Sequence, residues 1–222
     1  MVIGAFSKVG KLEKAVEVFR EMNGMGLTPN AASYNTLIAG YCSKGLLSSG
    51  MKLKNVMEKN EVRPSDVTYN VLINAFCNEG KLHEANKLFI EMKSVNVAPT
   101  TITYNILIRG YSQAGNSEMA SRLFEEMAII GIKADILTYN AVIMELCKKG
   151  KTKKAAYMCV RNNAQRAFQL CKSMMRSGCH PNEQTFKILL HAFVRNVDYD
   201  GAVLVLKEML ARSIAPDSRY VI

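Results

Sequence analysis

The stretch Val67-Thr68-Tyr69-Asn70-Val71-Leu72-Ile73, closed by Gly80, decides the fold because it recurs along the chain. Further copies begin at residues 32, 102 and 137. The tyrosines of the four copies follow one another at steps of 35 residues: Tyr34, Tyr69, Tyr104 and Tyr139. A fixed period of this size is typical of stacked supersecondary units, each of which packs only on its neighbours. The sequence therefore predicts a repeat array.

Each unit is predicted to be a helical hairpin. An apolar stripe at the helical period marks a first helix, formed by Tyr69, Leu72, Ile73, Phe76 and Cys77. Gly80 follows where a helix end favours a positive φ. A second stripe marks a second helix: Leu82, Ala85, Leu88, Phe89 and Met92. A proline in the connection is expected to stop this second helix in five units: Pro29, Pro64, Pro99, Pro181 and Pro216. The predicted fold class is all-α, a right-handed α-solenoid of stacked helix–turn–helix hairpins.

The period divides the chain, residues 1–222, into one array with a partial repeat at each end. The predicted units are a partial repeat 1–30, repeats 31–65, 66–100, 101–135, 136–182 and 183–217, and the start of a truncated repeat, 218–222. The unit 136–182 is 12 residues longer than the others. Twelve added helical residues would rotate the apolar face by about 120°. A bulge or loop is therefore expected near Arg161-Asn162-Asn163.

The repeat from Leu46 to Asn60 departs from the others at two core positions. It carries Gly50 where the other repeats have alanine, and Lys54 where others have phenylalanine. Glycine inside a helix costs about 0.5–1 kcal/mol relative to alanine. This repeat is predicted to be the least stable full unit.

The net charge of +10 is concentrated in one region. Nine basic residues and no acidic residue lie between Lys148 and Arg176, and the rest of the chain is almost balanced. Such a patch is compatible with a polyanionic partner, or with a solvated helix face. No apolar run approaches the roughly 20 residues that span a bilayer, so no membrane partner is expected.

The cysteines and histidines do not predict a metal site. Cys42, Cys77 and Cys147 occupy one core position in three repeats. The other cysteines lack CxxC spacing, and the three histidines are scattered. We expect no cofactor and, without a carboxylate cluster or a Gly-rich phosphate loop, no enzymatic activity.

An asparagine follows each of the four repeated tyrosines: Asn35, Asn70, Asn105 and Asn140. One residue corresponds to about 100° round a helix, so an asparagine beside a buried tyrosine points away from the core stripe. An amide at this place can donate to and accept from a base edge. Local capping or hydrogen bonding between repeats is the alternative explanation.

The repeated markers resemble the pentatricopeptide repeat (PPR) family. They are Thr-Tyr-Asn-x-Leu-Ile up to the glycine, Glu-Ala-x-x-Leu-Phe-x-Glu-Met, and a proline before the next unit. The chain is most similar to plant arrays of pure 35-residue repeats, which include organelle fertility restorers. The resemblance implies binding of single-stranded RNA, one base per repeat. It also implies a role in processing, stability or translation of a transcript in the mitochondrion or, alternatively, the chloroplast.

By the same resemblance, each asparagine pairs with the residue just after the end-of-unit proline, the last residue of its unit, to select a base. The implied couples are Asn35 with Ser65, Asn70 with Thr100, Asn105 with Asp135, and Asn140 with Asn182. They imply the target 5′-C-(C/U)-U-(C/U)-3′, with the N-terminus toward the 5′ end. Residues implied to flank the bases are Ala32, Val67, Ile102 and Leu137. Residues implied to reach phosphate are Lys148 and Arg195. Lys187 with Asp217 does not fit the code.

Two other interpretations are open. A tetratricopeptide-like protein-binding scaffold would repeat at 34 residues and use tryptophan, whereas this chain steps by 35 and has none. A truncated PPR product without a physiological target would fit the opening inside a repeat, which is expected to lack a targeting peptide. The expected partners are organellar RNA and a processing factor, and a monomer is expected.

Overall fold

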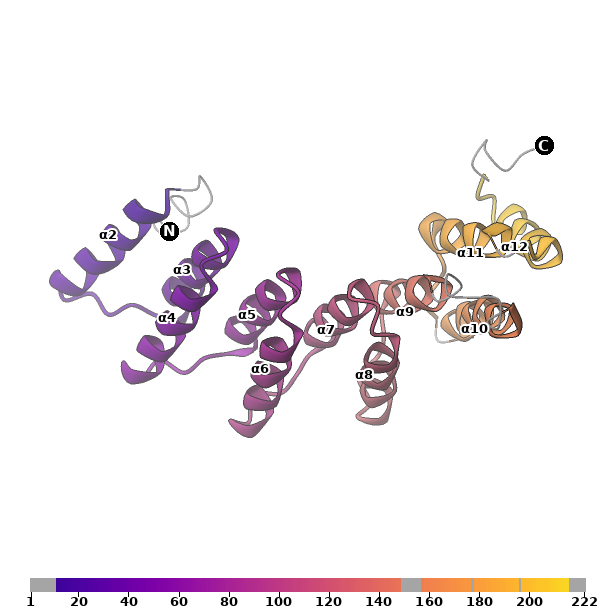
Figure 1. Ribbon diagram of the computed structural model, residues 1–222. Helices are drawn as coiled ribbons and strands as arrows, with labels where there is room; N and C mark the ends of the chain where they lie inside the picture. Colours follow the sequence, from indigo (N-terminus) through magenta and orange to yellow (C-terminus); the bar gives the residue numbers. More distant parts are fainter. Residues whose placement is uncertain (1–10, 149–156, 177, 196, 216–222) are drawn as a thin grey trace. The chain divides into compact units, whose positions relative to one another are not determined.

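The computed structural model describes residues 11–148, 157–176, 178–195 and 197–215. It comprises two compact units, Met1–Gly110 and Tyr111–Ile222. Each unit is built from paired α-helices (Figure 1). That residues 1–222 form one continuous array stays a prediction.

The first unit stacks helix pairs side by side. Its helices are α2 (Leu12–Gly24), α3 (Ala31–Ser43), α4 (Leu47–Lys59), α5 (Asp66–Asn78), α6 (Leu82–Ser94) and α7 (Thr101–Gln113), the last of which includes the boundary between the units. Helix α3 pairs with α4, and α5 pairs with α6. Helix α3 also packs beside α5 (Figure 1). The first helix of one pair therefore lies against the first helix of the next.

The second unit repeats this arrangement. Its helices are α8 (Ser117–Ile129), α9 (Ile136–Lys148), α10 (Tyr157–Arg176), α11 (Glu183–Arg195) and α12 (Tyr199–Ala211). Helix α9 pairs with α10, α11 pairs with α12, and α9 packs on α11. The predicted all-helical array of stacked helix pairs is confirmed.

The predicted apolar stripes form the core. The first-helix stripe of α5 is buried throughout, and the same holds for Ala85, Leu88, Phe89 and Met92 of α6. A phenylalanine of one pair meets the tyrosine of the next pair edge-on, with ring centroids 5.0–5.5 Å apart, in three places: Phe19–Tyr34, Phe89–Tyr104 and Phe124–Tyr139. Each such contact stabilises by about 0.5–1.5 kcal/mol beyond area burial.

Lys54 replaces the phenylalanine at the equivalent contact. Its side chain is only 3% exposed, and its ammonium pairs with Glu58 and Glu91 and lies 5.5 Å from the centroid of the Tyr69 ring. The Tyr69 hydroxyl donates to the same Glu91 at 3.0 Å. Burial lowers the pKa of Lys54, but hydrogen bonds and charge from the two glutamates outweigh it, so the net pKa is above its ordinary value. This repeat therefore holds a buried ion cluster in its core.

The first helices end as the sequence predicts. Gly45, Gly80 and Gly115 follow them with φ of 73°, 70° and 74°, while Gly10 and Gly150 lie outside the described residues. After α11, where glycine is missing, Val197 adopts φ of 57°. The positive-φ stop is thus kept even where its residue is unfavourable.

The expectation that prolines stop the second helices was wrong. Helix α4 ends at Lys59, and Glu61 takes φ of 59° three residues before Pro64. Asn96 and Ser213 do the same after α6 and α12. A left-handed residue ends each of these helices, and the proline only stiffens the connection after the helix has ended.

The expected bulge near Arg161-Asn162-Asn163 was also wrong. Helix α10 runs without interruption from Tyr157 to Arg176, 20 residues against 13 in each of the other helices named above. Ala167 is buried and precedes Phe186 by 19 residues, the same spacing as Ala85 before Tyr104. The packing half of α10 is therefore in normal register. Seven of the 12 added residues, the difference between 20 and 13, extend the N-terminal end of α10 beyond the half that packs in the array.

Candidate nucleic-acid interface

The first helix of each pair begins with the same kind of polar hydrogen-bonded junction. The residue before each helix donates its backbone N–H to a threonine hydroxyl three residues later, at 3.0–3.3 Å, in four repeats: Ser65 to Thr68, Thr100 to Thr103, Asp135 to Thr138, and Asn182 to Thr185. In return, the Asp135 and Asn182 carboxyl and amide oxygens accept the threonine N–H at 2.9 and 3.0 Å. These reciprocal bonds satisfy helix-start N–H groups that would otherwise lack partners.

The same threonine reaches back to the preceding repeat. Thr68 Oγ1 donates to Asn35 Oδ1 at 2.7 Å, and Thr185 Oγ1 donates to Asn140 Oδ1 at 2.6 Å. In two predicted couples, the two members therefore lie on opposite sides of a threonine. Thr68 lies between Asn35 and Ser65, and Thr185 lies between Asn140 and Asn182. The couple across the 12-residue insertion has the same junction as a couple of normal spacing.

The other two couples differ. Asn70 is 7% exposed, and its Oδ1 has no hydrogen-bond partner. The Thr103 hydroxyl instead lies 3.3 Å from the hydroxyl of Thr100. An unpaired buried carbonyl is costly, so the Asn70 amide lacks the stabilising contact that the Asn35 and Asn140 amides make. Asn105 lies in the first compact unit and Asp135 in the second, so that couple stays a prediction.

An exposed apolar residue precedes three of the buried threonines, Thr68, Thr103 and Thr138, whereas Gln184 precedes Thr185. Val67, Ile102 and Leu137 are 51%, 60% and 65% exposed, and Ala32 is exposed at the same place before Ser33. Large apolar side chains left in water at one position of successive repeats are typical of a binding surface. A base could stack on such a side chain beside the amide.

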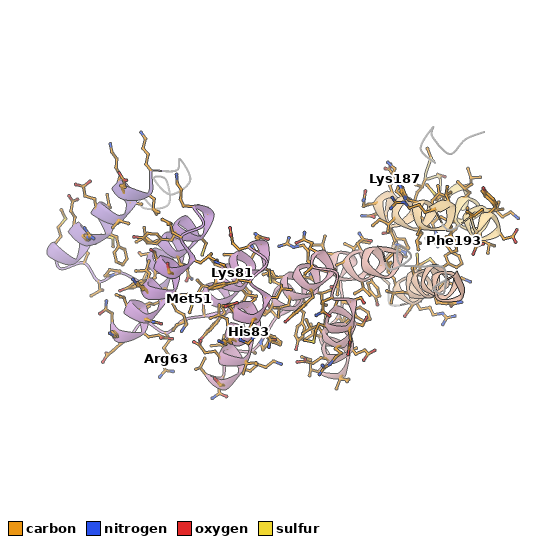
Figure 2. The ribbon with its side chains drawn as sticks, in the orientation of Figure 1. Met51, Arg63, Lys81, His83, Lys187 and Phe193 are labelled. Carbon is orange, nitrogen blue, oxygen red and sulfur yellow. The ribbon has the colours of Figure 1, made fainter. Side chains whose placement is uncertain are left out.

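The two predicted phosphate contacts are the last residues of their helices. Arg195 is exposed at the end of α11. Lys148 ends α9, but its side chain lies outside the described residues. Lys187, labelled in Figure 2, stands where the other repeats have asparagine, and its ammonium pairs with the Glu183 carboxylate on α11. The structure therefore gives the fifth repeat a charged pair in place of an amide.

Three of the cysteines that the structure describes are unsuited to nucleophilic or metal chemistry. Burial raises the pKa of the Cys42, Cys77 and Cys171 thiols to about 11, which keeps them protonated at neutral pH. Within the described ranges, no three His, Cys, Asp or Glu side chains are grouped so that they could hold a metal ion. No helix in the same ranges is long and apolar enough to cross a bilayer.

Sequence reasoning missed the contact between threonine and asparagine. The threonine was not among the predicted site residues. The recurrence of both residues at fixed places was the available signal. Hydrogen bonding between repeats, the alternative explanation, is present for Asn35 and Asn140 and leaves their amide nitrogens for other partners.

Stacked helix pairs with one polar junction per repeat define a class of helical repeat protein. The sequence pattern of the PPR repeat family matches residues 1–37, 29–78, 64–113, 99–148 and 156–195, and a second PPR repeat pattern matches 184–214. The chain belongs to the PPR repeat family.

Curated relatives from Arabidopsis thaliana match short segments. Pentatricopeptide repeat-containing protein At5g25630 is 41% identical over 56 residues, 25% of this chain and 10% of its own. Small ribosomal subunit protein mL103 (rPPR7) is 40% identical over 48 residues, 22% of this chain and 12% of its own. Mitochondrial pentatricopeptide repeat-containing protein At2g18520 is 38% identical over 47 residues, 21% of this chain and 11% of its own. The matches thus span about a tenth of each relative.

Solved PPR structures cover nearly the whole chain. Maize PPR10 is 27% identical with a TM-score of 0.67, over 97% of this chain and 29% of its own. PPR10 in complex with an 18-nt psaJ RNA element gives 22% identity and a TM-score of 0.70, over 96% and 29%. The PPR domain of Arabidopsis thaliana PRORP1 in complex with tRNA is 20% identical with a TM-score of 0.67. This match covers 85% of this chain and 93% of the PRORP1 domain. The latter two support the fold alone.

Proposed function

We propose that this protein binds single-stranded RNA sequence-specifically, one base per repeat, and acts without catalysis on an organellar transcript. The observation that carries the proposal is the threonine junction, which places the asparagine of one repeat beside the capping residue of the next. Membership in the PPR family supports RNA over the protein-scaffold alternative. The PPR10 and PRORP1 domains, which share the fold, are themselves known in complex with RNA.

The capping residues supply the chemical difference between repeats. Ser65 carries a hydroxyl, Asp135 only acceptors, and Asn182 both a donor and an acceptor. Together with the amide of the preceding asparagine, these groups would read the polar edge of a base while Val67 or its equivalent stacks on the ring. The proposed target is 5′-C-(C/U)-U-(C/U)-3′, with no base assigned to Lys187.

The size of the site limits its affinity. Stacking contributes about 1–3 kcal/mol per base, so four bases give roughly 4–12 kcal/mol before the cost of ordering the strand. Micromolar affinity requires about 8 kcal/mol. Weak binding by this chain is expected, with further repeats of a longer array raising affinity and specificity.

The proposal is tested by binding RNA oligonucleotides that differ only in the four central bases. The pyrimidine target should bind more tightly than the matched purine sequence, and equal affinity would exclude the code. Asp135→Asn should move the third preference from U toward C. The control is Asp198→Asn, because Asp198 caps α12 by accepting from Gly201 and belongs to no couple. An unchanged third preference in Asp135→Asn would rule out that couple.

The relatives support a proposal for the biological setting. One is described as mitochondrial and one as a small ribosomal subunit protein. We place this protein in the mitochondrion, with the chloroplast as the alternative, serving processing, stability or translation in the manner of fertility restorers. Detection of the endogenous protein in purified mitochondria, and of RNA crosslinked to it, tests this placement.

A further inference from the structure

The hydrogen-bond pattern fixes which atom of the asparagine faces the threonine. Thr68 Oγ1 accepts the N–H of Ser65 at 3.1 Å, which leaves its single proton to be donated elsewhere. That proton goes to Asn35 Oδ1 at 2.7 Å. The carbonyl of the Asn35 amide is therefore bound, and its NH2 group is the part left to meet a ligand.

The junction at Asn140 has the same polarity. Thr185 Oγ1 accepts the N–H of Asn182 and lies 2.6 Å from Asn140 Oδ1. Thr185 is fully buried, whereas Asn140 is half-buried, so the threonine is shielded from water while the amide remains reachable. The Thr185 hydroxyl also lies 3.0 Å from Asn182 Oδ1, but the shorter distance of 2.6 Å favours Asn140 Oδ1 as the acceptor of its proton.

We infer that Thr68 and Thr185 are specificity-determining positioning residues, which hold the amides of Asn35 and Asn140 with NH2 toward the RNA. This inference rests on the proposed function. The base atom at these two repeats must then be a hydrogen-bond acceptor, such as O2 of a pyrimidine or N3 of cytosine. An amide that is free to rotate could present either its donor NH2 or its acceptor oxygen to a base. Because the threonine holds the oxygen, only the donor is presented.

The repeat that carries Asn70 provides an internal comparison. Asn70 Oδ1 has no hydrogen-bond partner, and the neighbouring Thr103 hydroxyl lies beside that of Thr100. Thr103 still accepts the N–H of Thr100 at 3.0 Å, so it has the same capping role as Thr68. Replacing Thr103 therefore removes a cap without releasing a held amide.

The amide orientation can be measured without RNA. Valine matches threonine in shape but lacks the hydroxyl, whereas serine keeps it. In spectra of 15N-labelled asparagine side chains, Thr68→Val should shift the Asn35 NH2 resonances, and Thr68→Ser should restore them. Thr103→Val should leave the Asn35 resonances in place. Unchanged Asn35 resonances in Thr68→Val would overturn the inference.

The consequence for base preference is measured with two RNAs that differ only in the first base, C or A. Thr68→Val should weaken binding to the C-first RNA about fivefold, the scale of one net hydrogen bond, and bring the C-to-A affinity ratio toward one. Thr68→Ser and Thr103→Val should keep the wild-type ratio. If Thr68→Val keeps the same C-to-A affinity ratio as the wild-type protein, the inference is overturned. If the wild-type protein itself binds the two RNAs equally, the proposed function is overturned, and the side-chain spectra then decide the inference separately.

Discussion

Replacing Lys54 by phenylalanine should stabilise the first unit. The buried ammonium of Lys54 stands where Phe89 and its equivalents contact a tyrosine edge-on. Exchange of a buried ion cluster for a packed apolar group is often neutral or stabilising by about 1–4 kcal/mol. Because Glu58 and Glu91 are 40% and 38% exposed, they return to water at little cost. Taking the exchange at its neutral end and adding about 0.5–1.5 kcal/mol for the ring contact with Tyr69, we expect a gain of at least about 0.5 kcal/mol.

The truncation Lys54→Ala gives the opposite sign and serves as the matched control. It removes the buried aliphatic stem and leaves a cavity, which should cost about 2 kcal/mol. Repeat arrays do not always unfold in one step, so the measurement is amide hydrogen exchange of α4 and α5 combined with urea unfolding. A loss of more than about 1 kcal/mol in Lys54→Phe would refute the reasoning, because the ion cluster would then exceed an apolar contact in net stability.

The remaining predictions concern glycine packing and alkaline pH. Gly50→Ala gains about 0.5–1 kcal/mol of helix propensity, but its Cβ would lie 3.3 Å from Cys42 Sγ, a tight contact that offsets the gain, so a net change near zero is expected. Gly201→Ala should cost about 1–3 kcal/mol, because its Cβ would lie 2.1 Å from the ring of Phe193, which is labelled in Figure 2. Equal urea midpoints for the two variants would contradict this. The raised pKa of Cys77 and Cys171, about 11 against 9.0, means that the stability they contribute is complete below pH 9 and lost as pH rises to about 11. Urea unfolding should show this loss, reduced in Cys77→Ala; thiols that alkylate as fast as a free cysteine at pH 8 would argue against it.

The helices could be predicted because their signal is repeated and local. The stripe from Tyr69 to Cys77 recurs at a fixed step, and every repeat must bury the same face against its neighbours. Helix ends were harder to predict. Glu61 and Ser213 adopt positive φ without being glycine, because the neighbouring packing fixes the turn and overrides their local preference.

The candidate site was predictable in its positions and less so in its bonds. The asparagines and capping residues follow from the period, but the contact of Thr68 with Asn35 depends on how one pair docks on the next. The continuous α10 was missed for a similar reason. Spacing counts the added residues, yet only packing shows that Ala167 keeps the normal register.

The threonine junction also determines where such chains can be cut and rejoined. Under the proposed function, a base-reading unit would run from the asparagine of one helix to the threonine at the start of the next, for example from Asn35 to Thr68, and so would straddle the formal repeat boundary. Modules exchanged at the connecting proline would separate partners that share a proton. Chimeric arrays joined instead within the first helix, just before its asparagine, would keep each junction intact. Recombination between repeats at that point would transfer the asparagine together with the threonine and the capping residue that it contacts.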